Sequence, residues 1–93
     1  MRDYQIFMAP DEMNQQIAQR MRERRKEKHL TQATLSKRAD VSLGSLKRFE
    51  QTGEISLSSL IKIAFALGCE DDFHHLFAKK GYSSIQEVID EQS

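Results

Sequence analysis

Apolar residues recur along the first third of the chain at a spacing that predicts a helix. Met13, Ile17 and Met21 lie four residues apart, so they share one face of a helix that begins at Asp11. We expect this helix to end near His29, because histidine tolerates the left-handed conformation with which many helices end.

Hydroxyl residues precede each of the next three apolar runs. The side-chain oxygens of Thr31, Ser42 and Ser56 can each accept a hydrogen bond from the first turn of a helix, and Gly68 ends the last of these helices. The inward-facing residues predicted for the three helices are, in order, Leu35 and Ala39; Leu46 and Phe49; and Leu57, Leu60, Ile61, Ala64 and Leu67.

A fifth short helix is predicted to begin at the acidic pair of residues 71–72, because carboxylates favour a helix amino terminus. It presents Phe73, Leu76 and Phe77. These patterns predict an all-α fold, a compact bundle of about five helices.

The two ends of the chain carry shorter patterns. Residues 4–9 fit either a short strand or a lead-in without regular structure, and a last segment after Gly81 carries Ile85, Val88 and Ile89. We therefore expect an amino-terminal extension over residues 1–10, one domain over 11–80 and a tail over 81–93.

The composition narrows the class of protein. The 93 residues suffice for one small domain. The single Cys69 excludes an internal disulfide framework and fits a reducing compartment. The longest apolar run, residues 63–67, is far shorter than a membrane span, and the apolar stretch 6–9 stops at Pro10 before it could form a signal peptide. These features predict a soluble cytoplasmic protein.

The zero net charge conceals an uneven distribution. Residues 20–48 hold ten basic and three acidic side chains, a balance of +7, whereas the remaining residues hold four basic and eleven acidic ones. A basic middle with acidic flanks suggests an anionic ligand such as nucleic acid, or else a solvated helix face.

Residues 31–50, TQATLSKRADVSLGSLKRFE, place two short helices on either side of a tight turn, which is helix-turn-helix geometry. This run resembles the lambda-repressor/Cro-like (XRE-type) helix-turn-helix family, and the likeness extends over about residues 13–68. Three residues depart from the family pattern: Arg24 stands in place of leucine, and His29 and Asp40 stand in place of glycine.

The resemblance implies a sequence-specific, double-stranded DNA-binding regulator whose second motif helix enters the major groove. Arg48 is then the best reader of a base, through paired hydrogen bonds to guanine, with a phosphate contact as the alternative. The resemblance also implies a structural ion pair between Arg25 and Glu50. The candidate DNA-binding residues are Gln32, Lys37, Ser42, Leu43, Gly44, Ser45, Lys47 and Arg48, with Arg20, Arg22 and Arg38 as weaker phosphate contacts.

A second, narrower resemblance is to HipB-like antitoxins, which dimerise, bind operators and hold a HipA-like kinase. It rests on residues 42–50, 54–56, 71–73 and 76–77. We expect a homodimer and a repressor, with the dimer seam in residues 4–8 and 73–89. The alternative is a protein-interaction module that binds a toxin or another partner and has little direct role on DNA.

The sequence offers little for catalysis. His74 and His75 adjoin two aspartates, but adjacent helical residues do not face one another and no four-ligand spacing exists. Cys69 lacks an accompanying base, and no glycine-rich phosphate loop occurs. We expect no enzyme activity, no metal and no cofactor.

Overall fold

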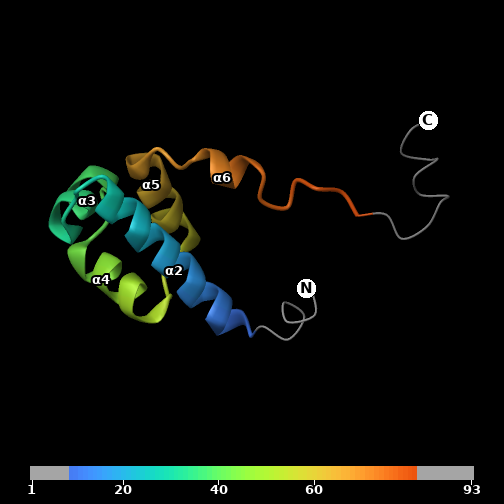
Figure 1. Cartoon of the computed structure of the whole chain (residues 1–93), viewed down its shortest axis with the longest axis horizontal. Helices are drawn as coiled ribbons and strands as arrows, with labels where there is room; N and C mark the ends of the chain where they lie inside the picture. The colour runs from blue at the N-terminus through green and yellow to red at the C-terminus, as the bar shows by residue number, and fades with distance from the viewer. Residues whose placement is uncertain (1–8, 82–93) are drawn as a thin grey trace.

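The computed structural model describes residues 9–81, which contain five α-helices and no strand (Figure 1). Helix α2 packs against α4, and α3 packs against both α4 and α5. The expected all-α bundle is confirmed for these residues, whereas the expected short strand and the apolar segment after Gly81 lie outside them. The helices are α2 (Pro10–Glu27), α3 (Gln32–Ala39), α4 (Leu43–Thr52), α5 (Leu57–Leu67) and α6 (Asp71–His74).

The three predicted amino-terminal caps are confirmed. The side-chain oxygens of Thr31, Ser42 and Ser56 each accept a hydrogen bond from the backbone N–H three residues further on, at 3.0–3.1 Å. Each cap satisfies one of the N–H groups that a helix start leaves without a partner. The boundaries of α3, α4 and α5 are therefore determined locally.

Left-handed residues follow α2, α3, α4 and α5, as the sequence predicts for His29 and Gly68. His29, two residues after the end of α2, has a φ of 57°, and Asp40, directly after α3, has a φ of 56°. Glycine supplies the same conformation after α4 and α5, where Gly53 and Gly68 have φ values of 81° and 73°. The short connections between helices follow from these reversals.

The core lies where α2, α3, α4 and α5 converge. Its largest fully buried side chains are Phe49, Leu35, Leu46 and Ile63. The inward positions predicted for α3 and α4 are thus confirmed. The smaller buried apolar residues are Ala18, Met21, Ala39, Ala64 and Leu67.

Two predicted inward faces are partly wrong. In α5, Leu57 is 60% exposed because it is the first residue of the helix, one turn ahead of Leu60. Ile63, which was not among the predicted inward residues, is fully buried. Helix α6 ends at His74, so Leu76 and Phe77 lie beyond the helix that was predicted to present them. Their side chains are 51% and 93% exposed.

Candidate nucleic-acid interface

Helix α4 separates apolar from polar residues on two faces. Leu46 and Phe49 are buried against the other helices. The exposed residues of its first two turns are Leu43, Gly44, Ser45, Lys47 and Arg48. The outer face thus carries two cations, a glycine that leaves the backbone open to close approach, and a single large apolar side chain.

Two serines hold the start of α4. The Ser42 hydroxyl accepts a hydrogen bond from the backbone N–H of Ser45 at 3.0 Å and donates to the Ser45 hydroxyl oxygen at 2.8 Å. Both serines are exposed. This arrangement orders the helix start, where hydroxyls and N–H groups commonly meet phosphates in protein–DNA complexes.

Arg48 forms an ion pair with Glu54, a carboxylate that lies beyond the turn at Gly53 and is not among the predicted site residues. Both side chains are well exposed, at 68% and 60%. An exposed ion pair contributes at most about 1 kcal/mol to the free energy of unfolding. Arg48 can therefore exchange Glu54 for an acceptor on another molecule at small cost.

The two residues predicted on α3 differ in their surroundings. Lys37 is exposed in the last turn of α3. Gln32 is half-buried, and its amide nitrogen donates to Glu50 Oε1 at 3.0 Å. Because a side-chain amide carries two N–H donors, the bond to Glu50 leaves one of them for a second acceptor.

Arg25 and Glu50 form the predicted ion pair, with two hydrogen bonds. Arg25 Nε donates to Glu50 Oε2 at 2.7 Å and Arg25 Nη2 donates to Oε1 at 3.0 Å, and the two side chains are only 10% and 6% exposed. Arg25 Nη1 also donates to the carbonyl of Leu30 at 2.8 Å. Together with Gln32, this cluster connects α2, α3 and α4 and fixes the orientation of α4.

The weaker candidates are spread over two helices. Arg20, Arg22 and Arg38 are all exposed, and Arg22 Nε lies 3.8 Å from Glu50 Oε1. The nearby Arg24 binds Glu27 through two hydrogen bonds of 2.8 and 2.7 Å. These bonds and the attraction of the Glu27 carboxylate raise the pKa of Arg24 above its ordinary value.

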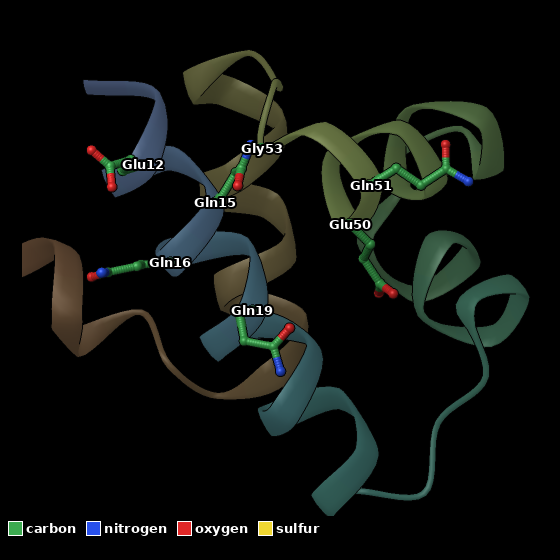
Figure 2. Close-up of a pocket in the computed structure, with 7 residues that line it drawn as sticks. All are labelled: Glu12, Gln15, Gln16, Gln19, Glu50, Gln51 and Gly53. Atoms are coloured by element: carbon green, nitrogen blue, oxygen red, sulfur yellow. The ribbon is translucent and has the colours of Figure 1, made fainter. Parts of the chain in front are cut away.

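A polar hollow of about 420 Å³ lies between α2 and the end of α4 (Figure 2). Carboxylates and amides line it and no basic side chain does, so it does not suit the phosphate backbone of a nucleic acid. Its residues are Glu12, Gln15, Gln16, Gln19, Glu50, Gln51 and Gly53.

Within residues 9–81, no group of three or more His, Cys, Asp or Glu side chains is placed to hold a metal ion. His75 Nε2 lies 3.6 Å from Asp71 Oδ2, and both side chains are exposed. No helix over the same range combines the length and the apolar character that a membrane crossing needs.

The comparison with protein families agrees with the geometry of α3 and α4. A family model described as helix-turn-helix matches residues 21–73, more than half of the chain, and its range includes α3, α4 and α5. No curated protein sequence shows significant similarity to the chain.

Proposed function

Since the chain belongs to the lambda-repressor/Cro-like (XRE-type) helix-turn-helix family, we propose that it regulates transcription by inserting α4 into the major groove of a specific DNA site. The two-faced character of α4 carries this proposal. Leu46 and Phe49 fix its inner face in the core, while the basic and hydroxyl residues of its outer face stay open to a ligand.

The proposed contacts divide into readout and positioning. Arg48 reads guanine through two of its guanidinium N–H donors, and Leu43 contacts a thymine methyl group. Gly44 lets the backbone approach the groove. The contacts that we propose for phosphates come from Gln32, through its remaining N–H, and from Lys37, Lys47, Ser42 and Ser45.

Replacement of Arg48 tests base reading. Selection of bound duplexes from a random pool first supplies the preferred site. We then expect Arg48→Ala to cost about 1–3 kcal/mol of binding free energy at that site and to relax specificity at one base pair, because the lost bonds are those to a base. Competition binding against single-base variants of the site measures both effects.

Arg24→Ala is the matched control. Arg24 also pairs with a carboxylate, but it lines a groove between α2 and α5 that contains no residue of α4. The Arg24→Ala substitution should leave the affinity for the selected site unchanged. If Arg48→Ala instead weakens selected and random DNA by the same factor and lowers the salt slope by about one, Arg48 contacts phosphate.

We also propose that the protein binds DNA as a homodimer. One motif reads only a few base pairs, and two half-sites about 34 Å apart supply the remaining affinity. Within the described part of the expected seam, Phe77 is 93% exposed and available to a second copy. The selected site should be palindromic, and sedimentation should show two chains per duplex; a single chain on a non-repeating site would contradict the dimer.

A repressor that also serves as the antitoxin of a HipA-like kinase is the finer form of this proposal. Two exposed aromatic side chains, Phe65 at 62% and Phe77 at 93%, support a protein partner in addition to DNA. Binding to DNA upstream of the protein's own gene, measured by mobility shift, supports autoregulation. The lack of any such shift would instead favour a module that binds only proteins.

A further inference from the structure

A second surface lies apart from α4. An apolar groove of about 510 Å³ runs between α2, α5 and the segment that follows α5, and no residue of α4 lines it. Ile17 and Met21 contribute from α2, Leu57 and Leu60 from α5, and Leu76 from the chain after α6. Leu57 and Leu76 are more than half exposed, so apolar area remains uncovered there.

We propose that the chain's own carboxyl-terminal segment, residues 84–91, occupies this groove. The segment lies outside the described residues, but its sequence fits the groove. Ile85, Val88 and Ile89 follow the i, i+3, i+4 spacing that places three apolar side chains on one face of a helix. An apolar helix face seated in an apolar groove is a common recognition mode.

Charge favours the same occupant. Residues 82–93 hold three acidic side chains and no basic one, whereas Arg20 and Arg24 line the groove. Arg20 donates only a long bond of 3.4 Å to the Gln16 amide oxygen, so its charge is poorly compensated. Asp72 is the acidic lining residue and Arg24 is already paired with Glu27, so Arg20 is the cation that remains for the acidic tail.

Arg20 disfavours a second copy of the chain in the groove. A two-fold interface sets the same patch of two chains against itself. A second copy would therefore bring another Arg20 to the same interface, and Arg20 has no carboxylate partner within residues 9–81. The acidic tail brings only charges of the opposite sign.

The connection is long enough for the tail to return within one chain. Eight residues separate Ile85 from Leu76, which already lines the groove, and the nine steps from Leu76 to Ile85 reach about 30 Å when extended. Gly81 lies between them and allows the chain to reverse. A tether of this length holds its segment at a local concentration in the millimolar range.

Cys69 makes the proposal measurable, because the chain's single thiol lines the groove and is half-buried. In the full-length protein, alkylation of Cys69 by iodoacetamide should be slow. Val88→Asp should accelerate it about tenfold, as expected when the docked state has been populated to about 90%. Leu57→Asp, at an exposed site on the groove itself, should accelerate it similarly.

Gln86→Asp is the matched control, since it adds the same charge to the tail but lies off the apolar stripe. It should leave the alkylation rate unchanged, and circular dichroism should show all four proteins folded. Rates that are equal in the wild type and in Val88→Asp would overturn the proposal. Protection of Cys69 that disappears on hundredfold dilution would also overturn it and would assign the groove to a second copy.

Discussion

Glu50→Ala is expected to lower the melting temperature by at least about 12 °C. Glu50 is 6% exposed and accepts hydrogen bonds from Arg25 and Gln32, so its removal leaves the Arg25 guanidinium buried without a counter-charge. Breaking a buried ion pair in this way lowers the free energy of unfolding by about 3–5 kcal/mol. Each kcal/mol lost lowers the melting temperature of a domain of this size by about 4–8 °C. Thermal unfolding followed by circular dichroism measures the shift.

Glu54→Ala is the matched control for the buried pair. Glu54 also pairs with an arginine, but both side chains of that pair are exposed, so the expected loss of unfolding free energy is at most about 1 kcal/mol. Equal destabilisation by the two substitutions would show that burial does not distinguish the pairs. Joint replacement of Arg25 and Glu50 by Met and Leu should restore part of the stability, because no buried charge then remains.

Gly53→Ala is expected to destabilise the protein by about 2–5 kcal/mol. The φ of 81° costs an alanine about 1–2 kcal/mol. Its Cβ would also lie 2.8 Å from the backbone carbonyl carbon of Asn14 and 2.9 Å from the backbone nitrogen of Gln15. Backbone atoms cannot move aside as a flexible side chain can, so α2 and α4 must separate, which adds about 1–3 kcal/mol.

Gly68→Ala separates the two contributions to this loss. Gly68 has nearly the same φ, 73°, but apart from the adjacent residues no atom lies within 4 Å of the position that its Cβ would take. Only the conformational cost should remain, about 1–2 kcal/mol in urea unfolding. If the two alanine variants unfold at the same urea concentration, the close approach of Gly53 to α2 does not contribute to stability.

The parts of the fold that were predictable from sequence are those that neighbouring residues determine. A hydroxyl residue at a helix start caps the helix through the N–H three residues further on, wherever that helix lies in the fold, as at Ser42 and Ser56. The face of α5 was harder, because apolar residues occur on most sides of that helix. Several inward stripes then fit the pattern equally well, and packing against α3 selected the stripe containing Ile63.

The candidate site shows the same division. The pair between Arg25 and Glu50 was expected from the family resemblance, and the structure contains it. The bond from Gln32 to Glu50 depends on how α3 crosses α4, which no local pattern encodes. The pair between Arg48 and Glu54 requires the reversal at Gly53, which brings the carboxylate back toward α4.

The division of α4 into a buried and an exposed face also bears on how new binding preferences can arise. Leu43, Gly44, Lys47 and Arg48 lie outside the core, and exposed substitutions usually change stability by less than about 0.5 kcal/mol. Leu46 and Phe49 hold the helix in place whichever residues stand beside them. Under the proposed mode of DNA binding, a lineage of duplicated genes can therefore diverge toward different DNA sites through these four positions while the core that holds α4 is unchanged.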